Sequence, residues 1–407
     1  MTSTRRVLSA VSLALMTTLI APPAALADSV VAAKKLPGNA PAPTGFKHRI
    51  SNSVLHFSWS KTQAVKSYSI QRSWNKTFTS GVVTKRTKST SMVFWSTPKG
   101  KAAYYRVRGW KDPKLTKYAR LDTKWSKRRT VKPSRGTTVI SAGTYNVCAY
   151  VCTRNDPSNP AKRWAVRSRG IASALKKQAN DVVGFQELGY AGSQSTGHRN
   201  SLLKLVSSTY GMAATSSYGR SIFYRKSTIT RVYASGLSLP NGSAEFKPPG
   251  ATEKRSVIWQ VLRHRASGAY FVAASTHLQW NTDNYKSEVR REQAKLAIAA
   301  VKKAAKGKPI VFVGDMNSHK AFDPNAPRKV YLSSGLKDTF DSATSRTNAS
   351  YNSFFSSTNP QTRRGLHLDQ VYVTGKWTPW KWSQRVSASG AAPSDHNYVS
   401  ASSALVY

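Results

Sequence analysis

Residues 309–317 constrain the fold of this chain more than any other stretch. Four consecutive apolar residues, 310–313, are entered from a Gly-Lys-Pro turn and left through Gly314. A run so rich in β-branching predicts a strand buried on both faces. Asp315 and Asn317 follow it, and because residues two apart on an extended chain point to the same side, both side chains can face one ion or phosphate. The alternative is a turn in which these two residues merely cap the strand end.

Similar polar residues stand at the termini of other apolar runs in the second half of the chain. Five predicted strands carry at a terminus a residue able to bind metal or move protons: Asn146, Glu187, His277, Asp315 with Asn317, and Asp395 with His396. Functional groups often collect at strand ends that a rigid scaffold holds. In so basic a protein, carboxylates retained at these positions indicate a cation site.

Two amphipathic helices separate these strands. The first spans residues 163–178, with Val166 and Ile171 at helical spacing, and the second runs from about 286 to 305, with Val289 and Leu296 on one side. Strands and helices mixed in this order predict an α/β domain with packed sheets.

The net charge is extreme. The chain has 63 Lys and Arg against 17 Asp and Glu, a formal charge of +46. This excess predicts attraction to polyanions, and a basic surface suited to an external milieu is the alternative.

The amino terminus predicts export. Arg5 and Arg6 precede an apolar run over residues 7–20, and residues 25–27 form a small-x-small cleavage site, so residues 1–27 fit a signal peptide. The twin arginines leave both the general secretory and the twin-arginine routes open. Because no later stretch has the ~20 apolar residues of a spanning helix, we expect a secreted, extracellular protein without stable membrane insertion.

Residues 28–40 have the composition of a linker, and residues 41–133 form a first domain. Short alternating runs at 54–59, 68–71 and 104–108, separated by turn residues, predict an all-β sandwich. This stretch resembles a fibronectin type III module, with Trp59 at the place of the core tryptophan. The resemblance implies a spacer or binding module. Residues 38–133 hold 22 lysines and arginines and two acidic residues, so a binding role for this charge is plausible.

The second domain, residues 137–407, follows a Pro, Ser and Gly cluster at 132–136. Its motifs, in order, are Thr-Tyr-Asn-Val, Gln-Glu-Leu, Ser-Thr-His-Leu-Gln, Gly-Asp-Met-Asn-Ser, Leu-Asp-Gln-Val-Tyr-Val and Ser-Asp-His-Asn. This order resembles the endonuclease/exonuclease/phosphatase superfamily with the deoxyribonuclease I fold. The resemblance implies a four-layer α/β sandwich, two packed sheets flanked by helices, that cuts phosphoester bonds with a divalent metal.

The resemblance also implies a role for each motif residue. Glu187 becomes the main metal ligand, with Asn146 and Asp395 near the same ion. Magnesium is the expected ion, with Mn²⁺ or Ca²⁺ as alternatives, since Mg²⁺ prefers hard oxygen ligands. Asp315 and Asn317 hold the phosphate or a second ion. His277 and His396 act on the phosphate oxygens and the attacking water. Asp369 orients His396.

Departures from the family pattern narrow this interpretation. Abasic-site endonucleases place an acid where this chain has Cys148 and a tyrosine where it has His277, so a repair role is not expected. Residues 218–221 supply no acid to pair with His277, whose carboxylate partner stays open. Cys148 and Cys152 can form a small-loop disulfide or remain two buried thiols. His319 and His367 lie close to motifs but have no implied role.

Three functions follow from the sequence. The first is a secreted, monomeric, metal-dependent phosphodiesterase that acts as a nuclease on nucleic acid or another phosphodiester polyanion. The second is a sphingomyelinase-like phospholipase C, which an exposed cluster of Trp377, Trp380 and Trp382 would favour. The third is a non-catalytic polyanion-binding protein, which the intact metal and histidine motifs argue against.

Overall fold

The computed structural model describes residues 41–51, 54–62, 65–95, 99–110, 123–133, 135–155, 158–189, 193–216, 219–232, 241–280, 287–319, 327–355, 362–386 and 392–407. The predicted signal peptide and linker lie outside the described residues.

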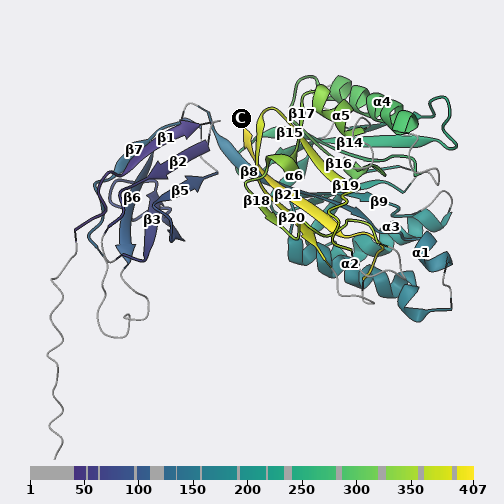
Figure 1. Cartoon of the computed structure of the whole chain (residues 1–407), viewed down its shortest axis with the longest axis horizontal. Coiled ribbons are helices and arrows are strands. Elements are labelled where there is room, and N and C mark those ends of the chain that lie inside the picture. The colour runs from purple at the N-terminus through teal and green to yellow at the C-terminus, as the bar shows by residue number, and fades with distance from the viewer. Residues whose placement is uncertain are drawn as a thin grey trace, which may run out of the picture.

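The first domain is built from strands only, over its described residues. They are β1 (Lys47–Ser51), β2 (Val54–Ser58), β3 (Ser67–Ser73), β4 (Val83–Thr87), β5 (Ser91–Phe94), β6 (Ala103–Trp110) and β7 (Arg129–Val131). They form two sheets, of order β1-β2-β5 and β4-β3-β6-β7. On β6, buried and partly exposed residues alternate, because one face of the sheet packs on a core that contains Trp59 and Tyr105. Figure 1 shows this domain beside the larger second one.

The second domain contains two seven-stranded sheets. The first has the order β10-β11-β9-β8-β21-β20-β18, and the second has the order β12-β14-β15-β16-β19-β17, with β13 paired to β14. The strands are β8 (Thr137–Asn146), β9 (Val182–Gln186), β10 (Tyr210–Thr215), β11 (Ser221–Arg225), β12 (Ile229–Arg231), β13 (Asn241–Phe246), β14 (Arg255–His264), β15 (Tyr270–His277), β16 (Ile310–Asp315), β17 (Leu336–Asp338), β18 (Ser345–Thr347), β19 (Asp369–Thr374), β20 (Trp377–Arg385) and β21 (Tyr398–Val406).

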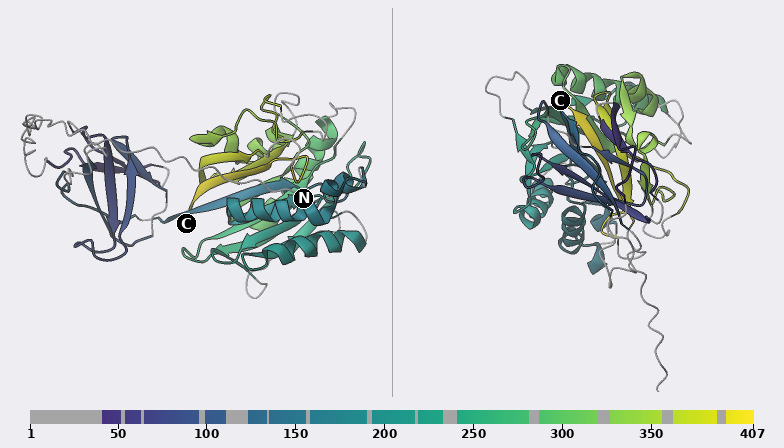
Figure 2. Two further views of the ribbon diagram at one scale, coloured as in Figure 1. Left: turned by 90° about the horizontal axis from the view of Figure 1, so that it is seen from below. Right: turned by 90° about the vertical axis from the view of Figure 1, so that its left-hand side faces the viewer.

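Helices cover the outer faces of both sheets (Figures 1 and 2). The helices of the described part of this domain are α1 (Val151–Arg154), the 3₁₀ helix η2 (Pro160–Lys162), α2 (Trp164–Gln178), α3 (Ser193–Val206), α4 (Ser287–Ala305), α5 (Pro327–Ser333) and α6 (Thr339–Ser342), of which α6 lies against strands of both sheets. One core lies between the sheets, a second packs the β14–β16 sheet against α4 and α5, and a third packs the β8–β9 sheet against α2 and α3. The mixed α/β fold with packed sheets predicted from the sequence is confirmed.

The pairing of strands brings polar strand ends from distant parts of the chain together. Parallel pairing of β15 with β16 sets His277 opposite Asp315, and antiparallel pairing of β16 with β19 sets Asp315 opposite Asp369. In the other sheet, β8 pairs in parallel with β9, so Asn146 stands opposite Gln186, next to Glu187. The sheet register alone therefore gathers candidate residues at one end of the domain.

Two details of the helix prediction are wrong. The spacing groups Val166 with Ile171 on α2 and Leu296 with Val289 on α4, yet Val166 and Leu296 are 50% and 45% exposed. The spacing of apolar residues predicts which side of a helix is buried but not how wide the buried side is. Val166 and Leu296 lie outside the buried sides of α2 and α4, which contain Ile171 and Val289. No helix among the described residues is long and apolar enough to cross a membrane.

Candidate active site

Asn146 joins two carboxylates at the centre of the site. Its side-chain Nδ2 donates to Glu187 Oε1 at 2.9 Å and to Asp315 Oδ2 at 3.1 Å, while its Oδ1 accepts from the backbone N–H of Cys148 at 3.1 Å. Glu187 follows β9 of one sheet and Asp315 ends β16 of the other. The Asn146 amide therefore fixes the distance between two carboxylates that come from different sheets.

Three non-glycine residues of the site have left-handed backbone conformations: Cys148 with φ 44°, Glu187 with φ 53° and Asn317 with φ 46°. Asparagine tolerates this region, but for cysteine and glutamate it is strained, at about 1–3 kcal/mol each. Such strain persists where the surrounding structure over-determines it. A disulfide between Cys148 and Cys152 closes the loop after β8, which settles the pairing that the sequence left open.

Arg167, buried on α2, ties the loop after β8 to the segment that carries Asp395. Its guanidinium donates to the carbonyls of Val147, Cys148 and Pro393 at 2.9–3.0 Å. Ser394 Oγ donates to the Asn146 carbonyl at 2.7 Å. These contacts hold the Asp395 segment against the strand end that carries Asn146.

Glu187 and Asp395 form the anionic part of the site. Burial, followed by the negative charge of Asp395, raises the pKa of Glu187 to about 7. A divalent cation would offset both the cost of burying the Glu187 charge and its repulsion by Asp395, since the ion neutralises adjacent carboxylates. The Glu187 and Asp395 carboxylates are hard oxygens, the kind that Mg²⁺ prefers, so they fit this ion. The Asn146 side chain turns its NH₂ group toward Glu187 and Asp315, so its oxygen would reach the same ion only with the amide reversed.

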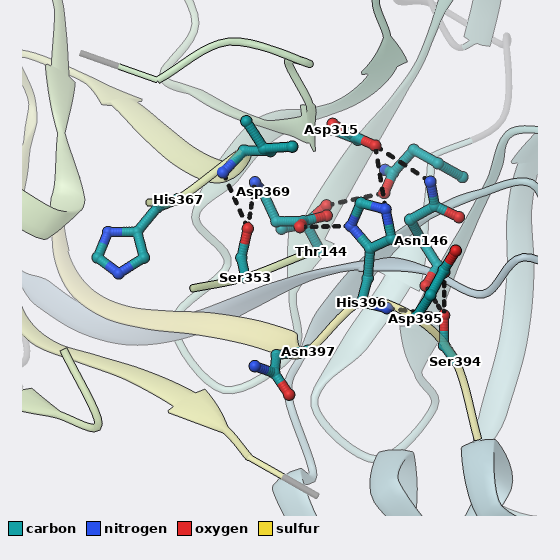
Figure 3. Close-up of polar contacts among 12 residues, drawn as sticks. Thr144, Asn146, Asp315, Ser353, His367, Asp369, Ser394, Asp395, His396 and Asn397 are labelled. Atoms are coloured by element: carbon teal, nitrogen blue, oxygen red, sulfur yellow. Dashed lines mark hydrogen bonds and ion pairs between the residues drawn. The ribbon is translucent and has the colours of Figure 1, made fainter. Parts of the chain in front are cut away.

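His396 is held as a cation by its surroundings. Its Nδ1 hydrogen-bonds Asp369 Oδ2 at 2.7 Å, and its Nε2 lies 3.7 Å from Asp315 Oδ2. Burial alone would lower the pKa of His396, but Asp369, Asp315 and Asp395 together outweigh burial and raise it well above the usual range. Figure 3 shows the ring between Asp369 and the Asn146 and Asp315 side chains.

His277 has the opposite electrostatic environment. Burial, then the positive charges of Arg255, Arg220 and His396, hold its pKa well below the usual range. Asn317 Nδ2 lies 3.0 Å from both the Leu278 carbonyl and His277 Nε2. Because the carbonyl can only accept, this side of the amide is the NH₂ group, and His277 Nε2 accepts as a neutral ring nitrogen.

The two histidines converge on one oxygen. His277 Nε2 lies 3.5 Å and His396 Nε2 lies 3.7 Å from Asp315 Oδ2. The structure thus brings together all eight residues singled out from the sequence: Asn146, Glu187, His277, Asp315, Asn317, Asp369, Asp395 and His396.

Sequence reasoning missed the basic residues of the site. Arg220 and Arg255, 1% and 7% exposed, line a cavity of about 390 Å³ beside Glu187 and His277, with Trp280 also in its lining. The sequence contains no signal for them, because arginines before strands are unremarkable among 63 basic residues.

Two other groups of residues near the site add no metal ligand to those already named. Cys148, Cys152 and Asp395 offer three ligand atoms within 4.8 Å of one another, but the sulfurs are joined in the disulfide. His319 Nε2 donates to the Gly365 carbonyl and His367 Nε2 donates to the Tyr351 carbonyl, and the two ring centroids lie 6.4 Å apart.

Comparison with known proteins gives the family. The model of the endonuclease/exonuclease/phosphatase family matches residues 143–396, more than half of the chain. The chain belongs to this family. Family members are phosphoric ester hydrolases that are generally dependent on a divalent metal, and this chain is an enzyme of that class. No curated protein matches the chain.

Solved structures of the family share the fold. An endonuclease/exonuclease/phosphatase from Bacteroides vulgatus has 20% identity and a TM-score of 0.53, covering 66% of this chain and 99% of its own. A family protein from Bacteroides thetaiotaomicron has 18% identity and a TM-score of 0.54, covering 67% and 97%. A mannosyl-6-phosphatase of B. thetaiotaomicron has 17% identity and a TM-score of 0.51, covering 66% and 99%.

Proposed function

We propose that this hydrolase is a secreted, Mg²⁺-dependent nuclease that hydrolyses phosphodiester bonds of extracellular nucleic acid. The observation that carries the proposal is a contrast of charge: buried carboxylates gather at one site in a chain of net charge +46. Positive charge of this size favours a polyphosphate backbone, and buried carboxylates with an amide favour a divalent cation.

Glu187, Asp395 and Asn146 would hold the metal. When bound, the ion neutralises charge on the phosphoryl oxygens and favours attack by water. Glu187 has to be ionised to bind it, so metal binding releases a proton at pH values below its raised pKa of about 7. In this structure the Asn146 NH₂ group keeps Glu187 and Asp315 in place.

The two histidines take different parts in the proposal. His396, charged through Asp369, donates a hydrogen bond through Nε2 to the phosphoryl group and stabilises its developing negative charge. His277, neutral, would take a proton from the attacking water at Nε2, with the water in the place that Asn317 Nδ2 holds in this structure. Asp315 Oδ2 lies 3.5 Å from His277 Nε2 and 3.7 Å from His396 Nε2.

The first domain is proposed to be a fibronectin type III module that retains polyanions. Its three-stranded and four-stranded sheets support this assignment. Arginines and aromatic rings alternate on the outer face of the larger sheet, with guanidinium carbons 4.0–5.1 Å from ring centres; in order they are Arg86, Trp110, Arg108, Trp125, Arg106 and Phe78. Rings on both sides hold Arg106 and Arg108 in fixed orientations, which suits repeated phosphate contacts.

The phospholipase alternative loses its structural support. Trp377 and Trp382 are each 1% exposed, so they pack in the domain core and form no exposed membrane-binding cluster. Trp380 stacks on Trp95 of the first domain, at 5.4 Å between ring centroids.

A three-substrate assay tests the proposal. Purified protein is incubated with plasmid DNA, RNA and sphingomyelin, each with Mg²⁺ and with a chelator, and Glu187→Gln serves as the matched variant. We expect Mg²⁺-dependent cleavage of nucleic acid that the variant loses and a lower Mg²⁺ affinity of the variant by calorimetry. Cleavage of sphingomyelin alone, or nucleic-acid cleavage that survives the chelator, contradicts the proposal.

A further inference from the structure

The cavity of about 390 Å³ opens on only one flank of the reaction site. Among the described residues, its lining includes Glu187 and His277, whereas His396 and Asp369 lie outside it. The cavity is therefore positioned for a part of the substrate next to the reacting phosphate. Its volume lies within the usual range for small-molecule sites, large enough for a single bound group of about nucleotide size.

The charge of this cavity is positive. Arg154, Arg220, Lys254 and Arg255 line it, against the carboxylates of Glu187 and Glu253. Arg255 pairs with Glu253, Lys254 Nζ lies 3.8 Å from Glu245 Oε2, and Glu187 belongs to the metal site. Arg220 and Arg255 are buried, and the positive charge of both lowers the pKa of His277. A phosphate bound in the cavity would form charge-assisted hydrogen bonds with such guanidinium groups.

The rim of the cavity is aromatic. Trp280, three residues beyond His277, is 61% exposed, and Tyr150 also lines the cavity. An exposed indole beside buried arginines offers a flat stacking surface next to an anion site, and this combination binds single-stranded nucleic acid in many proteins.

We propose that the cavity is a subsite for the nucleotide adjacent to the scissile phosphate. Arg220 and Arg255 bind that nucleotide's own phosphate, and Trp280 stacks on its base. The inference rests on the proposed nuclease function and deepens it, because it restricts the preferred substrates to strands with a second phosphate and disfavours isolated phosphomonoesters.

Three thymidine dinucleotides test the subsite: one without a terminal phosphate, one with a 5′-terminal phosphate and one with a 3′-terminal phosphate. Each has a single internal phosphodiester. Hydrolysis is followed with Mg²⁺ at pH 8, where His277 is neutral with or without Arg220. We expect one terminal phosphate to raise kcat/KM at least about tenfold, mainly through a lower KM, as charge-assisted hydrogen bonds predict.

Substitutions then locate the effect. Arg220→Met should remove most of the preference for the terminal phosphate, and Arg220→Lys should retain part of it, because an ammonium keeps the charge but not the planar fork. Lys303→Met, which removes an exposed charge from the last turn of α4, is the control and should keep the preference. Trp280→Ala, at an exposed position that the fold does not need, should raise KM about tenfold for all three dinucleotides.

The outcomes separate the inference from the function on which it rests. Equal kcat/KM for the three dinucleotides, or an Arg220→Met variant that keeps the preference, overturns the subsite while leaving the nuclease function intact. Because Arg220 is buried, its variants are first compared with the wild type by thermal unfolding. If they do not fold, Trp280→Ala becomes the decisive variant, and an unchanged KM for it overturns the inference. If the wild type cleaves neither the dinucleotides nor polymeric nucleic acid, the proposed function itself fails.

Discussion

His396 and His277 both lie near the same carboxylate oxygen, yet their surroundings shift their pKa values in opposite directions. Asp369, Asp315 and Asp395 surround His396, while burial with Arg255 and Arg220 acts on His277. Their Nε2 atoms lie 3.7 Å and 3.5 Å from Asp315 Oδ2. Because both rings lie near Asp315, the difference between them comes from their other charged neighbours, carboxylates at His396 and guanidinium groups at His277.

This asymmetry gives the site a cationic and a neutral imidazole at the same pH. Two histidines with ordinary pKa values would exchange roles through a narrow range near pH 6.5, whereas separated pKa values keep the donor and the acceptor distinct over several pH units. Carboxylates near His396 and guanidinium groups near His277 are sufficient to separate the pKa values of the two histidines.

The largest effect is expected from removing each ring in turn. His396→Gln should lower kcat roughly 10³-fold, because a neutral amide cannot replace a charged donor. His277→Gln should lower it less, about tenfold, because the glutamine oxygen can still accept a hydrogen bond from water. The measurement is kcat on a small phosphodiester at saturating Mg²⁺. Equal losses for the two variants would remove the distinction between the rings.

Asp369→Asn should sharpen the comparison by removing the charge behind His396. The variant is expected to lose roughly 10- to 100-fold in kcat at pH 8 and less at pH 6. Without the Asp369 charge the pKa of His396 falls, so the imidazolium is lost at a lower pH and the alkaline limb of the pH profile moves toward acid. A pH-rate profile tests this, and an unmoved alkaline limb would show that Asp369 has no role in setting the charge of His396.

Removing a charge behind the other ring should act in the opposite direction. Arg255→Gln should raise the pKa of His277 toward 6.5, and Arg220→Gln should do so by a smaller amount, since Arg255 is the stronger of the two influences. Protonated His277 cannot accept a hydrogen bond from water, so kcat should fall severalfold at pH 6 and little at pH 8. NMR titration of His277 measures the pKa directly, and a pKa unchanged in both variants contradicts this explanation.

Sequence reasoning found the face of the site that lies on strand ends. Asn146, Glu187, Asp315 and His396 were identified because five predicted strands all carry at a terminus a residue able to bind metal or move protons, and sheet pairing places such ends together. The mixed α/β fold was predicted for a related reason, since hydrophobic period depends only on local sequence. Both predictions used signals that are present within a few residues of the chain.

The other wall of the site could not be predicted from the sequence. Arg220 precedes β11 of one sheet and reaches His277 only because the two sheets pack together, whereas Arg255 opens β14, the strand paired with β15, which ends at His277. Arg167 acts from the middle of α2, where an arginine is ordinarily a surface residue. These contacts depend on packing between distant elements, which leaves no local pattern.

The smallest effect on catalysis is expected at a third histidine. His367 lies behind Asp369, on the far side from His396 (Figure 3), and lines a small cavity of about 20 Å³ with it. The centroid of its ring lies 4.5 Å from that of Phe340 and 4.9 Å from that of Trp382. Its Nε2 lies 3.1 Å from the Tyr351 carbonyl oxygen and donates a hydrogen bond to it. These contacts indicate a packed structural histidine.

His367→Gln should therefore change kcat by less than about threefold and leave the pH profile in place. The lost ring contacts should destabilise the domain by about 1–3 kcal/mol, which lowers the Tm by several degrees. Thermal unfolding and the pH-rate profile of the same preparation test both parts. A hundredfold loss of kcat at unchanged Tm would mean that His367 acts through Asp369 on His396, and the charge of His396 would then depend on a third imidazole as well as on the carboxylates around it.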